Sequence, residues 1–182
     1  MSAPVALIVG AGDYIGAAIA KRFAAGGFNV CLGRRNGEKL APLVAEIEAE
    51  GGIAHGYAMD ARDEESVTDV FARVEADHGP IELCIFNVGG NVRFPIRDTT
   101  ERVFRKVWQM ACYGGFLTGR EAARYMVPRG RGSIFFTGAT ASMRGGDGYV
   151  AARLLKERGL DVSLHALAPP NEGTDAAIAA EL

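Results

Sequence analysis

Near its amino end the chain reads Val5-Ala6-Leu7-Ile8-Val9-Gly10-Ala11-Gly12-Asp13-Tyr14-Ile15-Gly16. The five apolar residues at 5–9 predict a buried strand, and the apolar residues at 15, 19 and 23 share one face of the helix that should follow. Between them, three glycines within seven positions predict a tight turn. The expected order is therefore strand, glycine turn, helix.

This order is typical of a site for the pyrophosphate of a dinucleotide. A backbone without Cβ atoms can approach the phosphates closely, and the first N–H groups of the new helix face them. We expect Gly10 to make the tight turn, Gly12 to allow the close approach, and Gly16 to allow contact between helix and sheet. Because glycine makes up 24 of the 182 residues, the alternative is a plain strand-to-helix turn that binds nothing.

The size and composition of the chain fit one globular domain over residues 1–182. Its hydrophobic content is 48% and its formal net charge is −2, so no basic excess suggests a nucleic-acid partner. No apolar run is long enough to cross a membrane. Residues 1–4 lead directly into the first strand without the pattern of a secretory leader, and we expect a cytoplasmic protein.

The cysteines and histidines do not form a recognisable ligand pattern. Cys31, Cys84 and Cys112 are widely spaced in apolar sequence, which predicts reduced, buried thiols rather than a disulfide set. His55, His78 and His165 lack the spacing of metal ligands, so no metal site is expected.

Four further strands are predicted, at 28–33, 53–59, 81–86 and 132–137. Helices should separate them, because apolar residues recur at helical spacing. The two shorter helices carry Leu40, Leu43, Val44 and Ile47, and then Val67, Val70, Phe71 and Val74. Alternation of strand and helix predicts an α/β fold with a doubly wound, Rossmann-like parallel sheet and right-handed crossovers.

A longer helix is predicted at about 100–126, before a stop at 128–132. The pair Gly114-Gly115 near its middle costs stability unless close packing requires it, so a break between two helices is the alternative. The positions expected to face the core are Phe104, Val107, Trp108, Ala111, Phe116 and Ala123.

Four motifs occur in order along the chain. They are the glycine turn at 10–16, Asp60 after the third strand, Asn87-Val88-Gly89-Gly90 after the fourth, and Gly132-Ser133-Ile134 at the start of the fifth. With these motifs the chain resembles the short-chain dehydrogenase/reductase family from residue 5 to about 150. Tyr14 departs from the family pattern, because it stands where the glycine turn has its middle glycine.

The resemblance, together with the glycine turn, implies a nicotinamide dinucleotide as cofactor. The residues expected to hold it are Gly10, Gly12, Asp13, Tyr14, Ile15, Gly16, Asp60, Ala61, Asn87, Val88 and Gly89.

Arg34 and Arg35 follow the second strand and bear on the choice of cofactor. An acid at this place accepts both ribose hydroxyls of NAD, whereas an arginine pairs with the 2′-phosphate of NADP. No acid occurs there before Glu38. We therefore expect NADP in preference to NAD; the alternative is a solvated basic turn.

The family works with an Asn, Ser, Tyr and Lys set, which this chain matches only in part. The Asn position falls on Ala111 and the Ser position on Ala139. The common family spacing then places Ala152 at the tyrosine site and Lys156 at the lysine site.

A second alignment uses Tyr149 and Arg153, whose spacing puts both side chains on one helical face. Arginine holds its proton too firmly to join a proton relay. In this reading Tyr149 is the catalytic phenol, Arg153 or Lys156 is its cation, and Thr140 or Ser142 supplies the missing hydroxyl. The alternatives are a packed aromatic at a helix start, a solvated charge, and hydroxyls that only cap turns.

Residues beyond 150 depart from the family. Either 160–169 form a sixth strand, or 150–168 form one long helix and the sheet ends with the fifth strand. Residues 169–174 resemble the family's Pro-Gly-x-x-x-Thr segment beside the nicotinamide. The chain ends before the family's usual last strand, so we expect a fold abbreviated at its carboxyl end.

The sequence thus predicts an NADP(H)-dependent oxidoreductase that acts on a small carbonyl or alcohol substrate. Homo-oligomers are implied by the resemblance alone. A second hypothesis is a catalytically inactive dinucleotide-binding or structural homologue that has lost the proton relay, and Ala111 and Ala139 favour it.

Overall fold

The computed structural model of the protein describes residues 3–90 and 95–138. These residues divide into two compact units. One contains the described residues up to Val88 together with Gly114–Phe136, and the other includes the segment Gly89–Tyr113.

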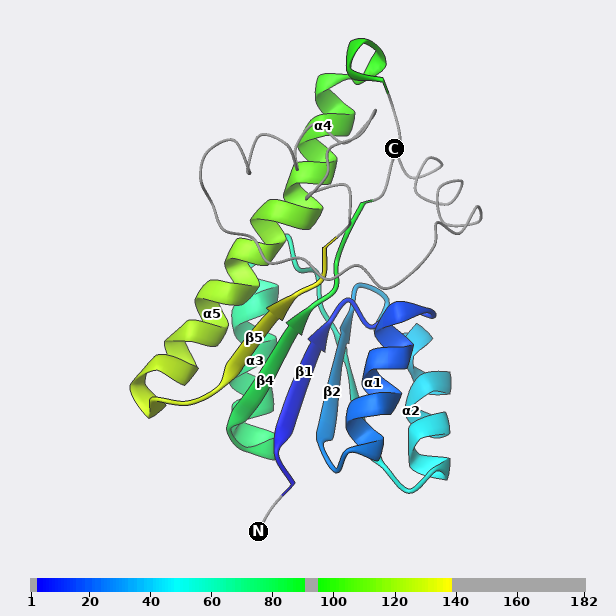
Figure 1. Ribbon diagram of the computed structural model, residues 1–182, viewed down its shortest axis with the longest axis vertical. Helices are drawn as coiled ribbons and strands as arrows, with labels where there is room; N and C mark the ends of the chain where they lie inside the picture. Colours follow the sequence, from blue (N-terminus) through cyan, green and yellow to red (C-terminus); the bar gives the residue numbers. More distant parts are fainter. Residues whose placement is uncertain (1–2, 91–94, 139–182) are drawn as a thin grey trace. The chain divides into compact units, whose positions relative to one another are not determined.

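The first unit is built on a sheet of five strands, shown in Figure 1. Their order is β3-β2-β1-β4-β5, and every neighbouring pair is parallel. The strands are β1 (Val5–Val9), β2 (Asn29–Arg34), β3 (Ile53–Ala58), β4 (Ile81–Phe86) and β5 (Ser133–Phe136). The predicted α/β class with a parallel sheet is confirmed.

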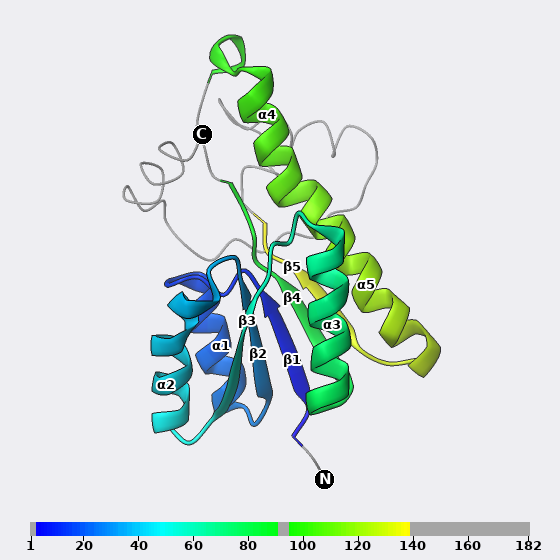
Figure 2. The same cartoon turned by 180° about the vertical axis from the view of Figure 1, so that it is seen from behind.

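Helices lie on both faces of this sheet. Figures 1 and 2 show α1 and α2 on one face and α3 and α5 on the other. Their bounds are α1 (Ile15–Ala25), α2 (Ala41–Ala49), α3 (Glu64–His78) and α5 (Gly114–Arg129), with the short 3-10 helix η1 (Gly37–Leu40) before α2. The strand order reverses beside β1, between β2 and β4, which is where open α/β sheets place their ligands.

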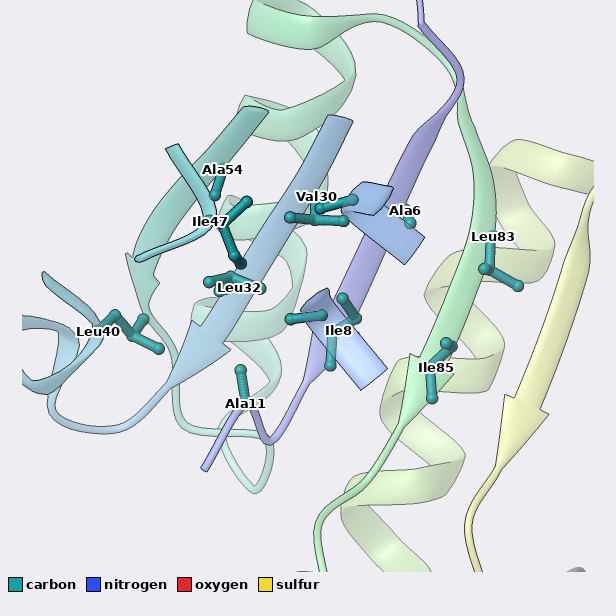
Figure 3. Close-up of a cluster of buried hydrophobic side chains, with 12 residues drawn as sticks. Ala6, Ile8, Ala11, Val30, Leu32, Leu40, Ile47, Ala54, Leu83 and Ile85 are labelled. Carbon is teal, nitrogen blue, oxygen red and sulfur yellow. The ribbon is translucent and has the colours of Figure 1, made fainter. Parts of the chain in front are cut away.

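The core between the sheet and α1 and α2 comes from alternate positions of neighbouring strands. Ala6 and Ile8 of β1 and Val30 and Leu32 of β2 have no exposed surface. Side chains two apart on a strand point to the same face, so these pairs stack in register (Figure 3). Ile47 of α2 is buried in the same cluster.

On the other face, α3 was correctly predicted in position and orientation. Val67, Val70, Phe71 and Val74 are all buried. The helix begins at Glu64 because the Asp63 carboxylate accepts a hydrogen bond from the backbone N–H of Ser66 at 3.0 Å.

The expected inward face of the long helical segment is wrong. Phe104, Trp108 and Phe116 are 45%, 43% and 56% exposed, and Ala111 is also exposed, while Val107 and Ala123 are half-buried. The residues of α5 that are buried are mostly small: Gly114, Gly115, Leu117, Thr118, Glu121, Ala122 and Met126.

The reason lies in the helix type and in close packing. Between α4 (Glu101–Trp108) and α5 the chain forms a π-helix over Gln109–Tyr113, which changes the helical phase. At Gly114 an added Cβ would stand 3.1 Å from the backbone oxygen of Ala61. The glycine pair therefore meets a packing requirement. The segment is two α-helices, as in the alternative of a break, but the interruption is the π-helix just before the glycine pair.

The second unit also contains the 3-10 helix η2 (Ile96–Asp98). Within this unit the rings of Trp108 and Tyr113 stack with centroids 5.6 Å apart. None of the residues of α4 or of the π-helix is buried.

The thiols divide between the two units. Cys31 of β2 and Cys84 of β4 are buried, as expected, and burial raises the pKa of each to about 12. Cys112 is exposed, so the prediction for it is wrong; it lies on the π-helix, which buries no residue.

None of the helices in the described residues is long and apolar enough to cross a lipid bilayer. Within residues 3–90 and 95–138, no group of three or more His, Cys, Asp and Glu side chains is placed to hold a metal ion.

Candidate cofactor site

The loops that follow β1 and β4 are joined at the carboxyl edge of the sheet. The backbone N–H of Asn87 donates to the carbonyl of Val9 at 2.7 Å, and its side-chain amide donates to the carbonyl of Gly10 at 3.1 Å. On the other side, the N–H groups of Gly10 and Ala11 both donate to the carbonyl of Gly33 at the end of β2. The glycine turn is thus held between its two neighbouring strands.

The three glycines of the turn have different surroundings. Gly10 has a φ of +89°, and an added Cβ would stand 2.7 Å from the carbonyl oxygen of Asn87. At Gly16 an added Cβ would stand 2.5 Å from the carbonyl oxygen of Gly10. At Gly12 no atom of the other described residues, its two chain neighbours apart, lies within 4 Å of the same point. At Gly10 and Gly16 the absence of a side chain therefore allows close packing within the protein, whereas Gly12 faces open space.

Helix α1 starts directly after this open space. Tyr14 is its N-cap with a φ of −113°, so this position does not use the positive φ that would favour glycine. The Tyr14 side chain does not cap the helix, the backbone N–H of Ala17 donates to the carbonyl of Gly12 at 2.8 Å, and the first turn contains no acid. Because the first N–H groups of a helix lack intrahelical acceptors, this end can bind an anion. Tyr14 and Ile15 are both exposed beside it.

Arg34, at the end of β2, forms a two-pronged ion pair with Asp13 of the glycine turn. Its Nη1 donates to Oδ1 of Asp13 at 2.6 Å and its Nη2 donates to Oδ2 at 3.3 Å. The hydrogen bond from Arg34 lowers the pKa of Asp13, and the charge of Lys39 acts in the same direction. This pairing and the approach of Lys39 were not predicted, because neither follows from spacing along the chain.

Asp60, after β3, is held by its own loop. Its carboxylate accepts from Nε and Nη2 of Arg62 at 2.9 and 2.7 Å, and from the backbone N–H of Arg62 at 3.0 Å. These bonds lower the pKa of Asp60, to which the charge of Arg35 also contributes. The pairing of Arg62 with Asp60 was not predicted. The sequence offers a signal for it, because Arg62 lies two residues after Asp60 in the loop that leads into α3. The neighbouring Ala61 is buried.

The turn after β4 is shared between the two units. Val88 belongs to the first unit. A Cβ added at Gly10 would stand 2.9 Å from the Cγ2 atom of Val88. Gly89 belongs to the second, and within the described part of the chain an added Cβ there would meet no atom within 4 Å.

None of the candidate catalytic residues is among those that the structure describes; of the positions on which the family's catalytic set falls, Ala111 alone is described. It is exposed and occupies the middle of the π-helix Gln109–Tyr113. The others lie outside the described residues: Ala139, Thr140, Ser142, Tyr149, Ala152, Arg153 and Lys156.

The donors and open space at this edge suit a dinucleotide. The start of α1, where the Tyr14 side chain does not cap the helix, suits a pyrophosphate. The space at Gly12 allows the phosphates to approach the backbone. Arg34 and Lys39 act on the carboxylate of Asp13, and Arg35 acts on that of Asp60, so cationic side chains lie at the same edge. A separate hollow of about 540 Å³ lies at the opposite edge, because Pro4, Phe28 and Pro80 beside it precede their strands.

Comparison with known proteins gives a consistent result. Residues 4–153 match the family described as short chain dehydrogenase. Gluconate 5-dehydrogenase of Gluconobacter oxydans is 36% identical over 134 residues, which are 74% of this chain and 52% of that protein. For 2,3-dihydro-2,3-dihydroxybenzoate dehydrogenase of Bacillus subtilis the identity is 32% over 139 residues, 76% of this chain and 53% of that protein.

Among solved structures, a short-chain dehydrogenase from Rhodopseudomonas palustris is 50% identical, with a TM-score of 0.76. The match covers 98% of this chain and 89% of that chain. By contrast, the chain spans about half the length of the two curated relatives.

Proposed function

Since the chain belongs to the short chain dehydrogenase family, we propose that it is an NADP(H)-dependent oxidoreductase acting on a carbonyl or alcohol substrate. The observation that carries this proposal is the open space at Gly12 beside the start of α1. A single dinucleotide-binding domain and a cytoplasmic location, both expected from the sequence, are part of the proposal.

The cations around the ribose end support NADP as the cofactor. Arg34 and Lys39 both act on the carboxylate of Asp13, and Arg35 acts on that of Asp60. A 2′-phosphate placed among these side chains would gain charge-assisted hydrogen bonds, whereas the ribose hydroxyl of NAD would gain much less.

In this proposal each part of the chain has a separate task. The N–H groups at the start of α1 hold the pyrophosphate, Asp60 and Ala61 lie beside the adenine, and Asn87 fixes the turn next to them. A bound nicotinamide would supply the hydride in reduction or accept it in oxidation. Tyr149 gives its phenolic proton to the substrate oxygen in reduction, and as the phenolate it takes the alcohol's proton in oxidation.

Two kinds of side chain assist Tyr149 in this scheme. The cation of Arg153 or Lys156 favours loss of the phenolic proton, and Thr140 donates a hydrogen bond to the same substrate oxygen.

A homo-oligomer is also proposed. The aromatic side chains of Phe104 and Trp108 on α4 are 45% and 43% exposed, and such surface often lies in interfaces. Light scattering after size-exclusion chromatography would test this part, and a monomer mass at micromolar concentration would contradict it.

A second candidate function is a dinucleotide-binding homologue without catalysis, and one observation favours it. Ala111 stands at the family's Asn position and presents no polar side chain at the π-helix.

Calorimetric titration with NADP⁺ and NAD⁺ separates the candidates, when combined with turnover assays over a panel of alcohols and carbonyl compounds. Binding with turnover supports the oxidoreductase, and binding without turnover selects the non-catalytic homologue. If neither dinucleotide binds, both are wrong.

A further inference from the structure

Resting on the proposed function, we infer that Asp13 is a specificity-determining residue that competes with the 2′-phosphate of NADP(H) for the guanidinium of Arg34. In the free protein the Asp13 carboxylate accepts hydrogen bonds from the two terminal nitrogens of Arg34 that a phosphate would use. Binding of NADP(H) requires the carboxylate to leave, and NAD(H) makes no such demand.

The geometry of the ion pair is the first support. Both terminal nitrogens of Arg34 are engaged, at 2.6 and 3.3 Å, and each meets a different oxygen of Asp13. This two-pronged arrangement is the one that arginine also uses with a phosphate. The carboxylate therefore stands in for the anion that the arginine is expected to bind.

The difference in exposure is the second support. The side chain of Arg34 is 22% exposed, and its residue ends β2, where its backbone carbonyl accepts from the N–H of Met59. The side chain of Asp13 is 69% exposed and belongs to a loop. The acid can therefore leave while the arginine stays in place.

Charge decides the direction of the effect. Ion pairs at exposed positions are weak, and a phosphate near neutral pH carries more charge than a carboxylate, so the phosphate can displace Asp13. The displaced carboxylate still lies next to the phosphate and repels it. Lys39 also acts on Asp13, so the carboxylate lowers the attraction of more than one cation for an anion.

The test is a set of titrations with NADP⁺ and NAD⁺ at low salt, on the parent, Asp13→Asn, Arg34→Gln and the double variant. Removing the carboxylate should raise the affinity for NADP⁺ about threefold to tenfold and change that for NAD⁺ less than about twofold. The gain should shrink as salt is added, because the repulsion is screened. In the Arg34→Gln background the gain should largely disappear.

Asp69→Asn is the matched control. It removes the same charge from another aspartate–arginine pair, formed with Arg73 at 3.4 Å on the exposed surface of α3. The affinity for either dinucleotide should not change. Asp13→Ser should act like Asp13→Asn, and thermal melting of each variant shows that it is folded.

A lower or unchanged affinity of Asp13→Asn for NADP⁺ would overturn the inference, since Asp13 would then position Arg34 or be irrelevant to it. Binding of NAD⁺ alone by all four proteins would overturn it as well, while leaving dinucleotide binding intact. If the parent binds neither dinucleotide, the proposed function fails and the inference fails with it.

Discussion

The carbonyl oxygen of Asn87 lies 2.7 Å from the point where a Cβ at Gly10 would stand. The loop after β4 therefore lies close against Gly10, and a hydrogen bond from the Asn87 side-chain amide to the Gly10 carbonyl joins it to the loop after β1. No side chain fits at position 10 unless one of the two loops moves.

Gly10→Ala should therefore destabilise the fold by about 2–4 kcal/mol, because a positive φ and a steric clash add together. Gly27 is the matched control: it has a φ of +86°, and none of the residues that the structure describes places an atom within 4 Å of an added Cβ. Gly27→Ala should cost only about 1 kcal/mol. Urea unfolding followed by circular dichroism measures both, and equal losses would show that the contact with Asn87 has no energetic effect.

Gly12→Val should leave the free energy of unfolding nearly unchanged, since the added side chain enters open space. It should abolish dinucleotide binding, because the valine occupies the place at which the pyrophosphate reaches the backbone. Calorimetry with NADP⁺ is the measurement, and Gly12→Ala should give an intermediate affinity. Parent-like binding by Gly12→Val would place the cofactor elsewhere.

The stability of the protein should depend on pH through Asp60. Its pKa is lowered in the folded state by Arg62, so its ionised form stabilises the fold. The unfolded pKa of an aspartate is about 3.9, so the contribution is complete above about pH 5 and is lost as the pH falls through the folded pKa. The difference in unfolding free energy between parent and Asp60→Asn should shrink accordingly on acidification. In an Arg62→Gln background, the difference made by Asp60→Asn should be smaller and should depend less on pH. If the parent's difference does not depend on pH, Asp60 does not contribute in this way.

Tyr149→Phe should reduce any carbonyl reduction by about 10² or more, because the general acid is removed, while the affinity for NADP⁺ stays within about twofold. Tyr125→Phe is the control, since Tyr125 lies on α5 with its ring stacked on Phe71. Steady-state kinetics of both variants measures the effect. Full turnover in Tyr149→Phe would show that another group donates the proton.

The elements nearest the amino end were the most predictable from sequence. Residues 5–9 are a short run of apolar residues that ends at Gly10, which favours a fully buried strand, and all five are buried in β1. The four apolar positions of α3 were correct for a similar reason, since their spacing matches one helical face and Asp63 marks the start.

The face of α5 could not be predicted from side-chain size, because Leu117 and Met126 are buried whereas Phe116 and Val127 are exposed. Glycine and other small residues bring this helix close to its neighbours, and Phe116 is left 56% exposed. The π-helical turn before α5 changes the phase, and no local residue pattern announces it. Side-chain pairs across the site, such as Asp13 with Arg34, depend on the register of β1 with β2 and were equally hidden.

Because two of the three cysteines are buried and one is exposed, thiol labelling can follow the unfolding of this protein. A maleimide added to the folded chain should modify Cys112 alone, since the thiolate is the reactive form and Cys31 and Cys84 are buried with a pKa of about 12. The other two cysteines lie on strands on either side of β1, so each added mass on labelling records an opening of the sheet. Pulsed labelling with mass spectrometry can therefore time the separation of β2 and β4 from the centre of the sheet in the unmutated sequence.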